Sequence, residues 1–161
     1  MKPSKKTPTS PALFKKPGVY LTLDIGNSIE LTVLHKDSKI TKVKTSLDRL
    51  VVDFIEAVSV SNKPYYLKDF CTDNFFKRKA GVSALALYKE TQEGSVGGAE
   101  TFVEFGANMG ALLANLDILF QPKHIVITGN LSKTFDAWSH AMGKTRNEHL
   151  GKKATAYVSV I

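Results

Sequence analysis

The sequence has few of the residues on which secreted and zinc-bound proteins depend. Its 161 residues contain one cysteine, Cys71, so neither an internal disulfide nor a thiolate zinc cluster can form within the chain. No apolar run is long enough for a membrane span, and residues 12–14, closed by Lys15 and Lys16, are too short for the core of a signal peptide. The histidines, which show no metal-ligand spacing, are His35, His124, His140 and His149. We therefore expect a cytoplasmic protein with no membrane segment and no zinc site.

Acidic residues are absent from the first 17 positions. This segment carries five of the seven net positive charges, which leaves +2 for the remainder. Four prolines stand among its Ser and Thr residues, so it cannot bury enough apolar surface to offset its ordering entropy. We expect residues 1–17 to be a disordered basic tail, too short and too rich in proline for a helix-turn-helix, and we expect no specific nucleic-acid partner.

The 144 residues from 18 to 161 are enough for one globular domain, and we expect them to form a single domain with a core. Alternating apolar residues predict a strand over residues 18–25, and a hairpin turn leads to a second strand from residue 29 to 34. A third strand is expected near residues 40–45. Ser46 is expected to cap a helix over residues 47–58, because apolar residues recur there at helical spacing.

The second half of the sequence alternates helical and strand patterns. Short helices are expected within residues 65–79 and a longer one over residues 83–91. A long core helix is expected from about Ala99 to Phe120, where Pro122 ends it, and an apolar run predicts a buried strand over residues 124–128. Ser132 is expected to cap a further helix, and residues 155–161 to return as a last or edge strand.

The long helix carries two kinds of stripe. Apolar residues that predict the core-facing side are Phe102, Phe105, Met109, Leu112, Leu113, Leu116, Leu119 and Phe120. Gly106, Gly110 and Ala114 recur at every fourth position on another side. Glycine inside a helix costs about 0.5–1 kcal/mol relative to alanine, so this spacing indicates close approach of a neighbouring helix.

Two turns contain residue types suited to binding phosphate. The first is Asp24-Ile25-Gly26-Asn27-Ser28, between paired strands, and the second is Thr128-Gly129-Asn130, between a buried strand and a helix. Glycine allows close backbone approach to an anion, and turn amides with Asn and Ser side chains donate to phosphate oxygens. A carboxylate such as that of Asp24 can hold a magnesium ion, often through water. Each turn alone is also what an ordinary connection would use.

Together, in this order, the two turns resemble those of the sugar kinase–hsp70–actin ATPase fold, and more narrowly those of the ROK family of bacterial sugar kinases and repressors. Residues 24–28 are similar to the first phosphate motif of that fold, Asp-Ile-Gly-Gly-Thr. Residues 105–136 resemble a ROK pattern, in which a glycine-bearing helix precedes a Pro-x-x-Ile-Val-Ile strand and a Gly-Gly turn that contacts adenosine. A weaker similarity of residues 24–28 to type III pantothenate kinases does not extend into residues 105–136.

The resemblance implies an α/β protein of the actin-like ATPase (ribonuclease H-like) fold in reduced form. Residues 18–161 would form one ROK-like domain, an N-terminal hairpin or meander with helices followed by a short βαβ-type unit. It implies that ATP and magnesium are the cofactors. The residues expected to surround phosphates and magnesium are Asp24, Gly26, Asn27 and Ser28, with Asp24 as the metal ligand, and those expected to flank the nucleoside are Thr128, Gly129 and Asn130.

Departures from the family pattern affect the expected activity. ROK kinases carry an Asn-Asp pair whose aspartate is the general base, sugar-binding residues and a Cys-rich zinc motif in a central segment that has no counterpart here; no Asn-Asp dipeptide occurs in the chain. Asn27 and Ser28 replace Gly and Thr, and Thr128 places a β-branched side chain where the family has glycine. No catalytic residue can therefore be assigned, and a bound sugar is doubtful.

Three interpretations follow from these residues. The first is a catalytically incomplete ROK-like protein, at most nucleotide-binding or regulatory, with a homodimer left open. The alternative is an active hexose kinase that transfers the ATP γ-phosphate to a sugar hydroxyl. The third is a decayed gene product without function.

Overall fold

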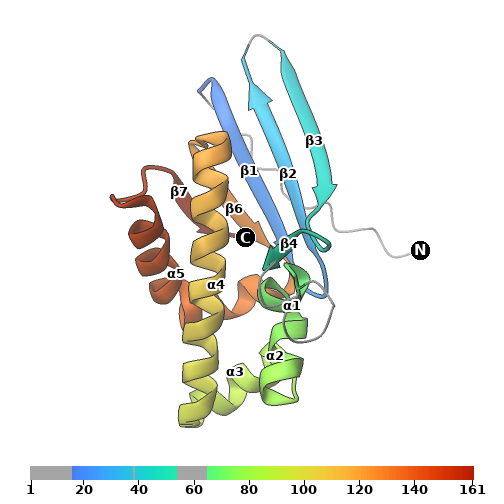
Figure 1. The fold of residues 1–161 in the computed structure, drawn as a ribbon, viewed down its shortest axis with the longest axis vertical. Coiled ribbons are helices and arrows are strands. Elements are labelled where there is room, and N and C mark those ends of the chain that lie inside the picture. The colour runs from blue at the N-terminus through green and yellow to red at the C-terminus, as the bar shows by residue number, and fades with distance from the viewer. Residues whose placement is uncertain (1–15, 38, 54–64) are drawn as a thin grey trace, which may run out of the picture.

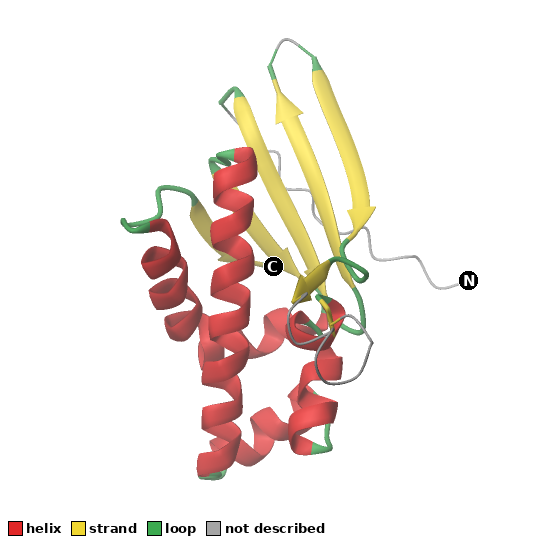
Figure 2. Cartoon of the chain, viewed as in Figure 1, coloured by secondary structure: helices red, strands yellow, loops and turns green. Residues whose placement is uncertain are grey.

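A five-stranded mixed sheet forms the centre of the molecule in the computed structural model, which describes residues 16–37, 39–53 and 65–161 (Figures 1 and 2). The strand order is β3-β2-β1-β6-β7, with β1, β2 and β3 antiparallel and with β1, β6 and β7 parallel. The strands are β1 (Gly18–Ile25), β2 (Ile29–Lys36), β3 (Ile40–Ser46), β6 (His124–Thr128) and β7 (Tyr157–Val160). All five strands expected from alternation or apolar runs are thus confirmed, and β7 lies at the edge.

The helix expected over residues 47–58 is wrong in its described part. Ser46 is the last residue of β3, and β4 (Val51–Asp53) pairs antiparallel with β5 (Tyr65–Tyr66) in a small second sheet. Two consecutive β-branched residues, Val51 and Val52, favour the extended backbone, and a partner strand is available from the later tyrosines. The rest of the expected helix falls in residues 54–64, outside the described residues, as do residues 1–15 of the expected tail.

The helices lie against one face and one end of this sheet, with α4 in front of it and α5 beside α4 in Figure 1. Side chains of Thr72, Ser83 and Ser95 cap the helices that follow them. The helices are α1 (Lys68–Cys71), α2 (Asp73–Ala80), α3 (Ala84–Gln92), α4 (Val96–Phe120), the 3₁₀ helix η2 (Asn130–Thr134) and α5 (Phe135–Leu150). Helix α4 therefore begins three residues before the expected start.

The expected cap at Ser132 is wrong. A 3₁₀ turn, η2, intervenes between β6 and α5, and Thr134 occupies the N-cap position of α5 without a capping side-chain bond. The Ser132 hydroxyl instead donates to the Gly129 carbonyl at 2.8 Å. A hydroxyl that bonds a nearby carbonyl stabilises a turn rather than a helix start.

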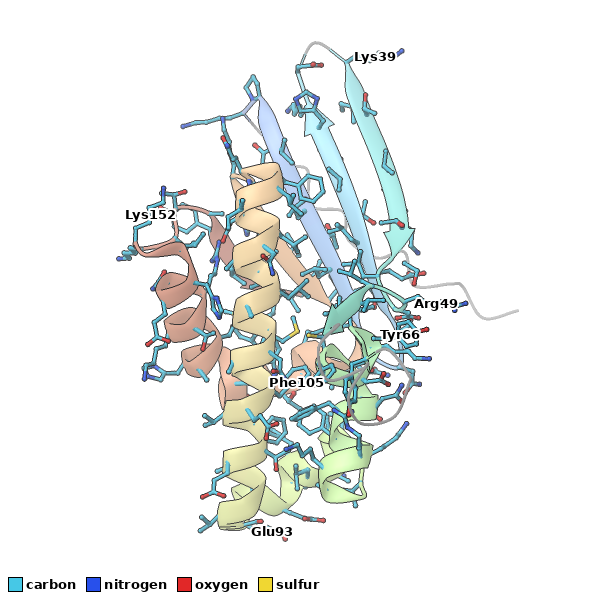
Figure 3. All side chains as sticks on the ribbon, in the orientation of Figure 1. Lys39, Arg49, Tyr66, Glu93, Phe105 and Lys152 are labelled. Carbon is cyan, nitrogen blue, oxygen red and sulfur yellow. The ribbon has the colours of Figure 1, made fainter. Side chains whose placement is uncertain are left out.

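The core lies between the sheet and α4. Leu21, Leu23 and Ile25 of β1 are fully buried, and rings from α2, α4 and α5 meet them in one cluster. Phe105, labelled in Figure 3, lies in the aromatic part of this cluster, with ring centroids 4.8 Å from Phe76 and 5.4 Å from Trp138. The expected core stripe of α4 is confirmed from Phe102 to Leu116. The prediction that Leu119 faces the core is wrong, because its side chain is 72% exposed near the end of the helix.

Two glycines bring α4 against α5. A Cβ at Gly106 would lie 2.5 Å from the Trp138 carbonyl oxygen, and one at Gly110 would lie 2.5 Å from that of Met142. Neither position has room for a side chain, so the glycine spacing is explained by helix packing. Further along the same interface, Arg146 holds Asp117 through two bonds, of 2.6 and 2.8 Å.

Helix α4 is also, among the described residues, long and apolar enough to cross a membrane by length and composition alone. The sequence prediction of no membrane segment did not take this into account. Half of its most apolar window is buried within the protein, against the sheet and α5. Such a helix passes the same test when it forms the core of a soluble domain.

Candidate functional site

The two turns expected to bind nucleotide lie side by side at one end of the sheet. Strands β1 and β6 are parallel neighbours with Asp24 opposite Thr128, so their carboxyl ends meet there. Gly129 has φ of +90°, and a Cβ on it would lie 2.5 Å from Asp24 Oδ1 and would also strike the Ile25 carbonyl. The 24–28 turn and the 128–130 turn are thus in direct contact, and glycine at position 129 is what permits it.

Asp24 lies in a polar row that crosses the sheet. Strand register places Glu30 on one side of it and Thr128 on the other. Glu30 pairs with Lys44 at 2.6 Å, and this hydrogen bond, together with the charge of Glu30, raises the pKa of Lys44. Within the described part of the chain the exposed side chain of Asp24 makes no hydrogen bond or close ion pair, although its charge also contributes to the raised pKa of Lys44.

Helix α2 supports the 24–28 turn from below. The Asp73 amide donates to the Gly26 carbonyl at 2.8 Å, which ties the turn to the start of the helix. One turn later Lys77 places its ammonium group 3.0 Å from Asp73 Oδ2 and 3.4 Å from Asn27 Oδ1. The ion pair of Lys77 with Asp73 therefore lies beside the turn.

A second ammonium group lies beside the 128–130 turn. Lys133 Nζ is 3.4 Å from Asn130 Oδ1, within the η2 turn. Sequence reasoning missed both lysines. The spacing of Lys133 from Asn130 could have indicated it, whereas Lys77 is brought to Asn27 only by tertiary folding.

Magnesium fits the donor set at Asp24. Mg²⁺ is usually held by one or two carboxylates, several waters and the phosphates of a substrate, and an exposed carboxylate at a strand end provides the protein part of that set. Within residues 16–37, 39–53 and 65–161, no three His, Cys, Asp or Glu side chains gather to enclose a metal ion. A phosphate-bound cation would therefore take one carboxylate, that of Asp24, from the described residues, which form no closed metal cage.

The expected site is an exposed edge. Gly26, Thr128 and Gly129 are half-buried, whereas the other four expected residues, Asp24, Asn27, Ser28 and Asn130, are exposed. Two cavities of about 530 and 710 Å³ lie near Pro122 instead, at the opposite end of β6, and none of the seven expected site residues lines either one.

The sheet order and the placement of its helices define the class of the fold. It is a mixed α/β lobe of the actin-like ATPase fold, and its described part matches one portion of larger enzymes of that fold. More narrowly, the fold is that of ROK sugar kinases and regulators, as the resemblance of residues 24–28 and 105–136 implied.

Three solved structures illustrate this similarity. A ROK family glucokinase from Streptomyces griseus, in complex with glucose and AMPPNP, has a TM-score of 0.68 at 14% identity and matches 91% of this chain and 56% of its own. For the ROK hexokinase from Thermus thermophilus the TM-score is 0.70 at 16% identity, over 89% and 52% of the two chains. A ROK family transcriptional regulator, a homologue of the E. coli MLC protein, has a TM-score of 0.68 at 11% identity over 89% and 41%.

The chain spans about half the length of the solved structures that it matches. No protein-family model matches the chain, and no curated protein matches its sequence. At identities of this size the similarity establishes the fold and not the activity, since one fold hosts kinases and a regulator alike.

Proposed function

We propose that this protein binds the phosphates of a nucleotide, with magnesium, at the 24–28 and 128–130 turns, and that it does not phosphorylate sugars by itself. The observation that carries the proposal is the direct contact between the two turns, with Gly129 against Asp24 at the carboxyl ends of two parallel strands. Ligands of open α/β sheets bind outside this end of the strands. The cytoplasm, where nucleotides are abundant, is the proposed location.

Each residue has a distinct part in this proposal. Asp24 would hold the magnesium ion, and the amides of Gly26, Asn27 and Ser28 would donate to phosphate oxygens. The Lys77 and Lys133 ammonium groups, which lie at the two turns, would offset the phosphate charge. Thr128, Gly129 and Asn130 would lie along the nucleoside, with Thr128 narrowing the approach.

The absence of an Asn-Asp pair from the sequence supports binding without transfer. The sequence has no Asn-Asp pair to accept the proton of a sugar hydroxyl. General-base catalysis contributes about 10²–10⁴-fold, and phosphoryl transfer depends on positioning of both reactants. A lobe that holds only the phosphates provides neither the base nor the sugar position.

The second candidate is an active hexose kinase, which the likeness to glucokinase and hexokinase structures favours. A coupled assay with magnesium ATP and glucose or N-acetylmannosamine separates the two functions. Turnover that exceeds background and is lost in Asp24→Ala would establish the kinase and refute the incomplete enzyme.

Calorimetry with magnesium ATP and magnesium ADP tests the binding proposal. Wild-type protein is expected to give saturable heat, and Asp24→Ala to bind at least about 10-fold more weakly, because a charged contact is lost. Asp37→Ala is the matched control, since Asp37 is an exposed aspartate at the other end of the β2 strand. Absence of heat with the wild-type protein would remove nucleotide binding from the account.

A further inference from the structure

Two cavities adjoin one another at the end of the sheet that lies away from the two turns. Both are lined by Gln121, Pro122 and Thr155. Their volumes, about 530 and 710 Å³, lie within the range of about 300–1,000 Å³ typical of small-molecule sites. Lys152, which is labelled in Figure 3, lies on the wall of the smaller cavity.

Positive charge dominates the lining of these cavities. Lys16 and Lys123 line the larger cavity and Lys152 the smaller one, and none of the three has a carboxylate partner within the described residues. Asp117, the carboxylate among the described lining residues, is nearly buried and is held by Arg146 through two hydrogen bonds. The lysine charges are therefore left to solvent or to a ligand.

The larger cavity is held in shape at its rim. The Tyr20 hydroxyl donates to the Lys16 carbonyl at 2.7 Å, and the Lys123 ammonium donates to the Pro17 carbonyl. The first bond fixes the backbone at Lys16, and the second holds the Lys123 ammonium on a neutral carbonyl oxygen, which leaves its charge uncompensated. The Lys123 ammonium is thus placed before any ligand arrives, which lowers the entropy cost of binding.

Aromatic rings complete the larger cavity. Tyr157 is 78% exposed on the edge strand β7, and its ring lies 6.5 Å from the ring of His124 at an interplanar angle of 61°. His124 Nε2 lies 2.8 Å from Ser159 Oγ, and burial lowers the pKa of His124, which leaves the imidazole neutral near pH 7. Because Tyr157 is exposed and lines the same cavity as Lys16 and Lys123, its ring presents a flat surface beside the two lysines.

We propose that the larger cavity is a second binding site, which takes a small organic anion bearing a flat aromatic ring, of the aryl phosphate class. Lys16 and Lys123 bind the anionic group, and the ring stacks on Tyr157. Pro122 forms the apolar floor, and the neighbouring cavity beside Lys152 accommodates a substituent on the ring. This site is independent of the nucleotide proposed for the two turns.

Nuclear magnetic resonance titration of the full chain with 1-naphthyl phosphate tests this site. Saturable shifts are expected at the amides of Gln121, Lys123 and Thr155, with little change at Gly26 and Gly129. The neutral analogue 1-naphthol and inorganic phosphate, which each retain one half of the probe, are expected to bind at least about 10-fold more weakly.

Charge-removing variants locate the anion. Lys123→Gln and Lys16→Gln, which keep side chains of similar length, are expected to lower the affinity for 1-naphthyl phosphate at least about fivefold. Tyr157→Leu is expected to lower the affinity for 1-naphthyl phosphate without changing that for inorganic phosphate. Lys89→Gln, on α3, is the matched control and is expected to leave the affinity unchanged. Equal binding of 1-naphthol, shifts confined to the two turns, or full affinity in both Lys16→Gln and Lys123→Gln would each overturn the proposal.

Discussion

Packing of α4 on α5 leads to a prediction about Gly110. A Cβ at this position would lie 2.5 Å from the Met142 carbonyl oxygen, 2.8 Å from Thr145 Cβ and 3.0 Å from the Arg146 amide nitrogen. Two of these three atoms belong to the backbone of α5 and cannot rotate away. Gly110→Ala must therefore push the helices apart or distort one of them.

The expected magnitude follows from two opposing effects. Overpacking of a close interface costs about 1–3 kcal/mol, whereas alanine in place of glycine inside a helix contributes about 0.8–1 kcal/mol. We expect Gly110→Ala to lower the free energy of unfolding by up to about 2 kcal/mol, which lowers Tm by up to about 8 °C for a chain of this size. Gly143 lies in α5 with nothing within 4 Å of a built Cβ, so Gly143→Ala is expected to raise stability by the same propensity change, about 0.8–1 kcal/mol.

Urea denaturation followed by the fluorescence of Trp138, which is fully buried, measures both variants against the wild type. The two alanine substitutions share the same change in helix propensity, so the difference between them isolates the helix contact. If Gly110→Ala were as stable as Gly143→Ala, the explanation of the glycine spacing by close packing would be refuted.

Three other residues give testable expectations. Asp117→Ala leaves the nearly buried Arg146 guanidinium without its carboxylate partner and is expected to cost about 3–5 kcal/mol in urea denaturation; a loss below about 1 kcal/mol would contradict this. Burial raises the pKa of Cys71 to about 12, so iodoacetamide at about pH 8 is expected to alkylate it only after unfolding, and rapid native-state labelling would oppose this. Burial lowers the pKa of His124 below 6.5 in the folded protein, so the stability that its neutral form contributes is present above pH 6.5 and is lost as the pH falls below that value. His124→Gln should therefore reduce the change in urea midpoint between about pH 7.5 and 5. An unaltered dependence of the urea midpoint on pH would argue against it.

Local sequence was sufficient for most of the fold. Alternating or continuous apolar residues determine β1, β2 and β6, because one or both faces of each strand are buried against the helices. The apolar stripe of α4 likewise identified its core side up to Leu116. The prediction that Leu119 is buried was wrong because the helical spacing of apolar residues continues beyond the part of α4 that other elements cover.

The helix expected after Ser46 shows where local reasoning ended. Leu47, Leu50 and Val51 have helical spacing, yet Val51 pairs with Tyr66, a residue that no local pattern connects to it. A short apolar run fits either structure, and long-range strand pairing decided the outcome. The prediction that Ser132 caps a helix was also wrong, because its hydroxyl donates to the Gly129 carbonyl within a tighter turn.

The candidate site was predictable in composition but not in arrangement. Turn chemistry indicated Asp24, Gly26 and Gly129 individually, whereas their contact depends on the parallel register of β1 with β6. Lys77 reaches Asn27 because the fold places the start of α2 against the 24–28 turn, where the Asp73 amide donates to the Gly26 carbonyl. Such contacts follow from tertiary structure, and sequence spacing alone does not encode them.

The most direct measurement of the central claim is a magnetic resonance titration of the full chain with magnesium ADP. Saturable shifts are expected at the amides of Gly26, Ser28 and Gly129. The affinity obtained from these shifts is expected to fall at least about 10-fold in Asp24→Ala and to be retained in Asp37→Ala. Saturable shifts that cluster at Lys123 and Thr155 instead, or no saturable shift at all, would contradict nucleotide binding at the two turns.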